Sequence, residues 1–168
     1  MSLGDTLGEW EKFSEAETWY LKCIDLSQEL GIKGYLVEAQ IGLAEVKIAI
    51  GMHEEAQRLC DEADTISETA GMRLKQAACL RLKGMLRTEN EEWATAEENY
   101  SESLKNFNNL KAEPEVARTQ YRWAEMLLAK GDVARGKKLL ESGLMIFKKK
   151  GMKLWAERCR KALDNNPK

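Results

Sequence analysis

A fixed 40-residue repeat constrains the fold of this chain more than any other feature of its sequence. Gly31, Gly71 and Gly151 are separated by whole 40-residue periods, and Lys111 occupies the vacant place. Three further columns keep the same spacing without insertion: Ala16, Ala56, Ala96 and Gly136; Tyr20, Cys60, Tyr100 and Leu140; Cys23, Ala63, Ser103 and Gly143. Self-similarity at such a period is typical of repeat proteins, in which each unit packs only on its neighbours.

Each repeat is predicted to contain two helices. The glycine column supplies the left-handed residue that ends a helix, as illustrated by residues 34–50, a turn near Gly51 and a second helix at residues 53–70. The small residues recur seven apart on the second helix, so they share one face that another helix can approach closely. Such a hairpin cannot cover its own apolar face, and it therefore stacks on the next copy.

We therefore predict one all-α domain over residues 1–168, an α-solenoid of stacked antiparallel helix hairpins. Its expected parts are a partial first repeat at 3–30, a second repeat at 34–70, a third at 73–110, a fourth at 113–150 and a C-terminal capping helix at 152–164. Leu3, Gly4 and Leu7 match only the later part of a first helix, as expected of a piece cut from a longer protein.

Charge is distributed unevenly along the chain. Residues 1–70 hold 5 basic against 15 acidic side chains, whereas residues 111–168 hold 15 basic against 7 acidic. No apolar run reaches the roughly 18 residues that span a bilayer, and no secretion signal is present, so a cytoplasmic location is expected. The four cysteines form no C-x-x-C pair and lie beside apolar residues in helical patterns, which predicts reduced, mostly buried thiols.

The repeat resembles the tetratricopeptide repeat. The likeness is carried by the pattern at Leu3, Gly4, Leu7, Phe13, Ala16, Tyr20, Cys23 and Ile24, and it recurs along the chain. The resemblance implies a right-handed superhelix. The usual repeat has about 34 residues, so the longer period here is closer to the repeats of kinesin light chain and of the C-terminal arrays of large bacterial regulators. HEAT repeats, with a similar period, are the alternative.

Three residues depart from the family pattern. Lys83 and Arg87 occupy places that are normally apolar, and Gly136 replaces the expected alanine. We therefore expect looser packing in the third and fourth repeats.

The resemblance also implies where a partner binds, because the first helices of this family line a concave groove. The groove residues implied for this chain are Glu38, Ile41, Glu45, Arg81, Met85, Arg118, Tyr121, Arg122 and Glu125. The guanidinium groups beside an aromatic ring suit carboxylates or an acidic extended peptide.

Nothing in the sequence predicts catalysis, a cofactor or a metal. The only histidine, His53, falls in the column of Phe13, Trp93 and Val133 and is expected to pack in the turn between helices. No Gly-rich phosphate loop, G-x-S-x-G elbow or H-E-x-x-H helix occurs. Pairs of acids such as Glu54 with Glu55 begin helices, where they oppose the helix dipole favourably.

The leading hypothesis is a non-catalytic module that binds a protein or peptide, as part of a larger signalling or transcription-control protein. The first alternative is a head-to-tail homo-oligomer, because an acidic first end and a basic last end attract each other. The second is nucleic-acid binding through the basic end, which contains Lys148, Lys149 and Lys150. Nucleic acid is the less favoured partner, because cations are expected at a helix C-terminus in any case and few aromatic residues accompany them.

Overall fold

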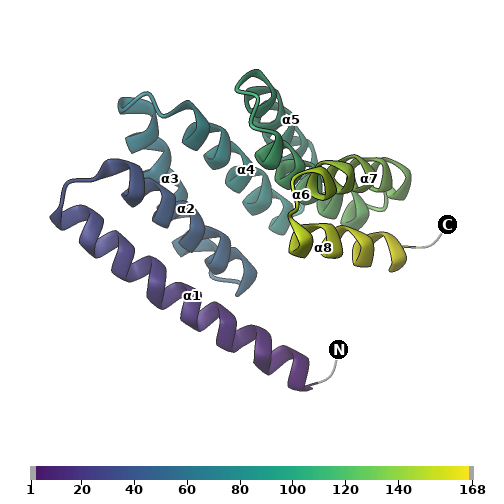
Figure 1. Cartoon of the computed structure of the whole chain (residues 1–168), viewed down its shortest axis with the longest axis horizontal. Helices are drawn as coiled ribbons and strands as arrows, with labels where there is room; N and C mark the ends of the chain where they lie inside the picture. The colour runs from purple at the N-terminus through teal and green to yellow at the C-terminus, as the bar shows by residue number, and fades with distance from the viewer. Residues whose placement is uncertain (1–2, 167–168) are drawn as a thin grey trace. The chain divides into compact units, whose positions relative to one another are not determined.

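The computed structural model describes residues 3–166, with side chains from residue 12 onward, and these residues form eight α-helices and no strand. The helices are α1 (Leu3–Glu29), α2 (Lys33–Ala49), α3 (His53–Thr69), α4 (Arg73–Glu89), α5 (Trp93–Asn109), α6 (Glu113–Lys130), α7 (Val133–Lys149) and α8 (Lys153–Asp164). Figure 1 shows them in chain order, from α1 in purple to α8 in yellow. The prediction of an all-α fold is confirmed.

The same short turn connects every pair of successive helices in the described part of the chain. After α1, the N–H of Gly31 donates to the carbonyl of Gln28, and the N–H of Ile32 donates to the carbonyl of Ser27. These two bonds define a Schellman ending, in which the residue that donates the first bond takes the left-handed conformation. That residue is in turn Gly31, Gly51, Gly71, Glu91, Lys111, Gly131 and Gly151, with φ between 55° and 92°. The left-handed conformation predicted for Gly31, Gly71 and Gly151 is confirmed.

α1 is longer than the pattern indicates. Residues 3–10 were expected to end a first helix before a turn and a second helix at Phe13, but α1 runs without a break from Leu3 to Glu29. Glu11 stands in the column of Gly51, Glu91 and Gly131. Glu91 takes the left-handed conformation at this place, whereas Glu11 remains within the helix.

The chain divides into two compact units, one ending at Leu82 and the other beginning at Lys83 within α4. In the first unit α2 packs between α1 and α3. Its most deeply buried residues include the small-residue column of α3, and among them are Val37, Leu43, Ala44, Ala56, Cys60, Ala63, Ala77, Cys79 and Leu82. The columns recognised in the sequence thus lie in the core where they fall on α3, and their residues on α1 are partly buried.

A buried lysine joins the three helices of the first unit. The side chain of Lys47 on α2 is only 5% exposed, and its Nζ lies 2.6 Å from Glu17 on α1 and 2.9 Å from Glu55 on α3. Burial lowers the pKa of Lys47, but the hydrogen bonds and charges of Glu17 and Glu55 raise it more, so the net shift is upward. Lys47 therefore remains charged and links the helices on either side.

In the second unit α6 packs against α5 and α7, and α8 packs against α7. A methyl group added to Gly136 would lie 3.0 Å from Leu128 and 3.3 Å from the carbonyl oxygen of Ala124, and one added to Gly143 would lie 3.3 Å from the carbonyl oxygen of Ala117. Both glycines therefore allow the backbones of α6 and α7 to approach closely. At Gly136, the expectation of looser packing is wrong.

We predict that Lys111→Gly and Glu91→Gly each raise the free energy of unfolding by about 1 kcal/mol, because glycine adopts positive φ without steric cost. Thermal and urea denaturation followed by circular dichroism measure this change. The reverse substitution, Gly71→Ala, should lower stability by a similar amount. Equal stability of all three variants and the wild type would contradict the importance of the left-handed residue.

We predict that Lys47→Ala lowers the free energy of unfolding by about 3 kcal/mol, because it removes the cation of a buried ion pair. Lys47→Leu should lose less, since Leu127 fills the equivalent place two repeat periods later.

The pH dependence of unfolding in urea provides the control for this prediction. Because folding raises the pKa of Lys47 above its ordinary value of 10.5, its contribution is complete below pH 10.5 and is lost as the pH rises through the folded-state pKa. This alkaline loss should be absent from Lys47→Leu. An identical alkaline profile in both proteins would show that Lys47 does not act through its charge.

Candidate functional site

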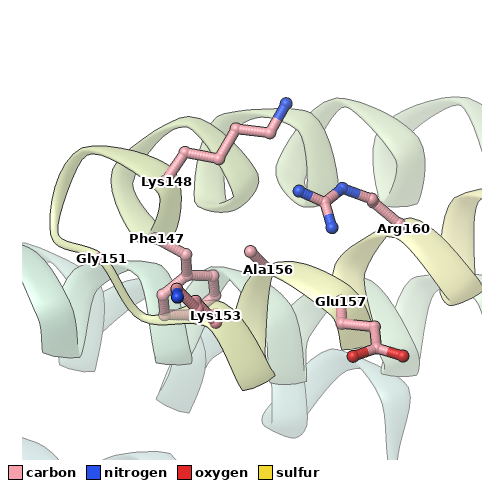
Figure 2. Close-up of a pocket in the computed structure, with 7 residues that line it drawn as sticks. All are labelled: Phe147, Lys148, Gly151, Lys153, Ala156, Glu157 and Arg160. Carbon is pink, nitrogen blue, oxygen red and sulfur yellow. The ribbon is translucent and has the colours of Figure 1, made fainter.

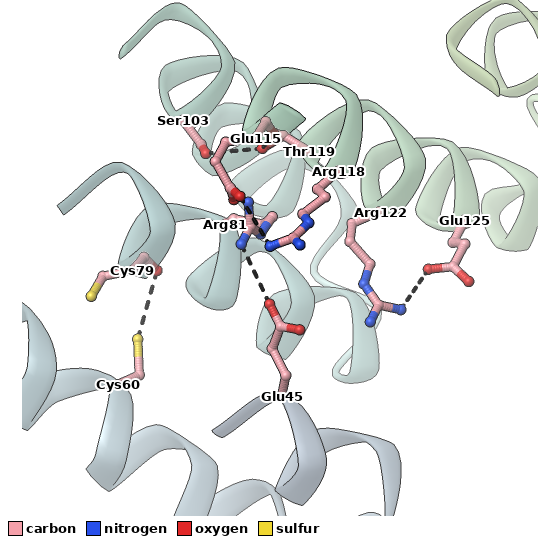
Figure 3. A network of polar contacts seen from close by, with 10 residues as sticks. All are labelled: Glu45, Cys60, Cys79, Arg81, Ser103, Glu115, Arg118, Thr119, Arg122 and Glu125. Atoms are coloured by element: carbon pink, nitrogen blue, oxygen red, sulfur yellow. Dashed lines mark hydrogen bonds and ion pairs between the residues drawn. The ribbon is translucent and has the colours of Figure 1, made fainter. Parts of the chain in front are cut away.

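The groove residues implied in the first unit are largely occupied by contacts within that unit. Glu38 forms an ion pair with Lys75, and Glu45 lies 3.4 Å from Arg81, whose side chain is only 4% exposed (Figure 3). Ile41 is buried. Arg81 and Ile41 therefore offer little accessible surface, and the exposed Glu38 and the partly exposed Glu45 already have basic partners.

The second unit brings four of the implied residues together on α6. Arg118 and Tyr121 lie on successive turns, followed by Arg122 and Glu125. Arg118 donates to Glu115 at 3.0 Å and Arg122 donates to Glu125 at 2.9 Å, as Figure 3 shows. Met85, in contrast, is buried. The accessible charges of this set therefore belong to α6.

An aromatic cluster lies beside these arginines. Trp155 on α8 meets the ring of Tyr121 edge-on, at a centroid distance of 5.5 Å and an interplanar angle of 80°. The ring of Phe147 on α7 lies 5.6 Å from Trp155 at an angle of 23°. Because Phe147 is fully buried and Tyr121 nearly so, the cluster holds Trp155 in a defined position at the edge of the core.

Three guanidinium groups surround this aromatic cluster. Arg118 lies 5.4 Å and Arg158 lies 5.0 Å from the centre of the Trp155 ring, while Arg122 lies 5.8 Å from the ring of Tyr121. Cation–π contacts of this kind hold a cation over a ring without neutralising it. We call Arg118, Arg122, Arg158, Tyr121 and Trp155 the arginine–tryptophan patch.

Burial, assisted by Glu125, keeps the hydroxyl group of Tyr121 protonated by raising its pKa. Burial raises its pKa most, and the charge of Glu125 and a hydrogen bond to it raise the pKa further, against the opposing effects of Arg122 and Arg158. The phenol therefore stays neutral and remains a hydrogen-bond donor. The patch as a whole combines neutral aromatic surface with cations.

The patch can bind an anion, and its one nearby thiol is not activated. Burial raises the pKa of Cys159 to about 11, with a smaller effect from Glu125, so the thiol stays protonated at neutral pH. Nucleophilic cysteines need the opposite shift. Among the residues that the structure describes, no group of three or more His, Cys, Asp or Glu side chains is placed to hold a metal ion.

Two residues of the patch were not among the implied groove residues. Arg158 lies in the capping helix, one 40-residue step from Arg118. Continuing the column of Arg118 into the last helix would have identified it. Trp155 follows Glu115 by the same step, and no column pattern marks it as part of a site.

The described residues form an all-α protein with a helical repeat-like fold. Among solved structures, BtubC (BKLC) from P. vanneervenii is similar, with a TM-score of 0.62 and 22% sequence identity over 99% of this chain and 81% of that chain. At this identity the similarity concerns the fold alone. No protein-family model matches the chain, and no curated protein matches it in sequence.

No helix within residues 3–166 combines the length and the apolar character that crossing a bilayer requires.

We predict that alkylation of the native protein in mildly alkaline buffer modifies Cys23 first, because it is only partly buried while Cys60, Cys79 and Cys159 are fully buried. Mass spectrometry of peptides measures the rate at each site. Unfolding in urea should make all four thiols reactive, and Cys23→Ser should remove the fast phase. Rapid native modification of Cys159 would contradict its burial and its raised pKa.

Proposed function

We propose that this chain is a non-catalytic, protein-binding repeat module of the tetratricopeptide type, and that it binds an acidic extended segment of a partner protein at the arginine–tryptophan patch. The observation that supports the proposal most directly is the position of Arg118 and Arg158, both within 5.4 Å of the centre of one tryptophan ring. Paired guanidinium groups beside an accessible aromatic edge suit a peptide that carries both carboxylates and apolar side chains.

The charge state of the arginines favours a carboxylate ligand. Arg158 is exposed, and no acidic side chain among residues 12–166 forms an ion pair with it. Arg118 and Arg122 have acidic partners on α6, but part-exposed ion pairs of this type contribute only about 0–1 kcal/mol. A ligand carboxylate that accepts two hydrogen bonds from one guanidinium can displace such a partner.

The 40-residue columns support the tetratricopeptide assignment, since they carry the small and aromatic residues that the family places at its helix contacts. The long period is shared with kinesin light chain and with the C-terminal arrays of large bacterial regulators. By that resemblance, we propose that the module is a right-handed solenoid. We place it in a signalling or transcription-control protein of the cytoplasm.

The implied groove residues of the first unit have a structural role in this proposal. Arg81 and Glu45 pair with each other and Ile41 fills the core, so we assign binding to the α6–α8 part of the second unit. Glu38, which is exposed and paired with Lys75, remains on the surface of the first unit. The partner then needs to engage only one of the two units.

Nucleic acid is the less favoured ligand because part of the basic run is already paired. Lys149 lies 3.4 Å and Lys150 lies 2.7 Å from Glu113, and both lysines lower the pKa of that carboxyl group. Cations held by a carboxylate contribute less to binding phosphate. The aromatic residues that would stack on unpaired bases are also absent from the run at Lys148–Lys150.

We predict that Arg118→Gln and Arg158→Gln each weaken binding of a fluorescein-labelled glutamate-rich peptide about tenfold, because each removes a charge-assisted hydrogen bond. Fluorescence anisotropy measures the dissociation constant, and circular dichroism checks that helicity is unchanged. Binding should also weaken as salt is added.

The matched control is Lys138→Gln, which removes an exposed cation from α7 outside the patch. It should leave the affinity nearly unchanged. An equal loss in all three variants would mean that the peptide senses only overall charge. Tighter binding of a labelled single-stranded RNA than of the peptide would favour the nucleic-acid alternative.

A further inference from the structure

Two helices of this chain expose faces that the repeat elsewhere uses for contacts within a hairpin. In the 40-residue register, α1 carries the columns of a second helix and α8 carries those of a first helix. The hairpin of α6 and α7 shows what a first helix and a second helix do together, because their backbones approach closely at Gly136 and Gly143. Comparison with that hairpin identifies the corresponding faces of α8 and α1.

α1 exposes apolar side chains at the positions equivalent to those that α7 uses to pack against its neighbours. Trp19 and Leu26 stand in the columns of Leu139 and Ile146, which pack against the core of the second unit. On α1, however, Trp19 is 70% exposed and Leu26 is 56% exposed. Leu30, at the end of the same face, is 62% exposed. A row of large apolar side chains in water marks a surface for association.

The corresponding face of α8 borders a pocket of about 450 Å³ between α7 and α8 (Figure 2). Phe147 and Ala156 form its apolar part, and Lys153, Glu157 and Arg160 surround it. In the 40-residue register these three charged residues replace Glu113, Ala117 and Gln120. Those residues of α6 are the ones that meet α7.

The α6–α7 contacts supply the template for this comparison. Glu113 pairs with Lys149, the carbonyl of Ala117 lies where Gly143 passes, and Gln120 donates to Ser142 at 3.0 Å. A helix that packed on α8 in the same way would bring its own equivalents of Lys149, Gly143 and Ser142 to Lys153, Glu157 and Arg160.

One of the equivalents on α1 matches α8 in charge. Glu29 stands in the column of Lys149, so the ion pair Glu113–Lys149 would be replaced by Lys153–Glu29 with both signs inverted. Lys22 stands in the column of Ser142, opposite Arg160, so this pair opposes the contact, and Glu157 one turn away reduces the repulsion. α1 holds two basic and seven acidic residues, whereas α8 holds four basic and two acidic, so the two helices attract each other overall.

We propose that the occupant of the α8 face is α1 of a second copy of this chain, so that copies associate head to tail and each junction completes one hairpin. The register sets which side chains meet, the apolar row of α1 covers the pocket, and the inverted ion pair selects the orientation. A head-to-tail contact is heterologous, so it extends beyond a dimer as concentration rises. A contact of one helix pair is small, and association is expected to be weak.

Sedimentation-velocity and light-scattering measurements over a concentration series test the proposal. The wild type should show a mass that increases steadily with concentration, and Trp19→Ser should weaken association about tenfold. Glu29→Lys and Lys153→Glu should each weaken it about fivefold, and the double variant should recover most of the loss. Both charge changes favour the dipole of their own helix, so the fold should not be weakened.

Matched controls are Glu68→Lys, near the end of α3, and Lys138→Glu, on α7, which make the same charge changes away from the two faces. Both should associate like the wild type. A wild type that stays monomeric up to its solubility limit would overturn the proposal.

Two blocked variants distinguish head-to-tail from face-to-face pairing. Trp19→Lys blocks the α1 face, and a variant carrying Lys153→Glu with Glu157→Lys, both at exposed positions, blocks the α8 face. Each alone should remain monomeric, whereas an equimolar mixture should form a dimer through the two intact faces and stop there. No dimer in the mixture, although both variants keep wild-type helicity, would overturn the head-to-tail arrangement. Because the blocked monomers keep the arginine–tryptophan patch, peptide binding can be measured on them separately.

Discussion

One backbone conformation determines how each described helix connects to the next. At each connection between the described helices, a single residue with positive φ lets two N–H groups return to the carbonyls of the preceding turn. The residue after it is the N-cap of the next helix, so no loop of variable length intervenes. Since all the connections are alike, each helix from α2 onward is followed by the next at a constant interval of half a repeat period. The faces of the helices consequently keep a constant register.

The constant register also explains the position of the candidate binding site. Gly136 and Gly143 let α7 pack closely on α6, and α8 packs against α7 with its Trp155 in contact with Tyr121 of α6. Arg118 and Arg158 are related by the 40-residue step and occupy equivalent places on α6 and α8. Trp155 lies where both can reach its ring. The patch is thus a product of the repeat, with one aromatic residue added to it.

Much of the fold follows from the sequence, and less of the site does. The glycine columns predict the helix ends because positive φ excludes most other residues, yet Glu91 and Lys111 adopt the same conformation without that signal. Small residues predict close helix contacts. Looser packing was expected at Gly136 because glycine lacks a methyl group, but the absence of that group lets the two helices approach more closely. Ion pairs such as Arg81–Glu45 join residues far apart in the sequence and depend on tertiary placement that composition and spacing do not reveal. The contacts of Trp155 with Tyr121 and Arg118 likewise depend on tertiary placement.

The identity of the turns affects how a chain of this kind changes in length. Removal of one whole repeat period between two equivalent turns rejoins the backbone in the conformation it already had, and the small-residue columns remain opposite one another. Removal of half a period also rejoins the backbone smoothly, but it exchanges first and second helices and places bulky residues against bulky residues. Gene duplication and deletion can therefore lengthen or shorten the array in whole hairpins, while half-hairpin changes are opposed by packing alone.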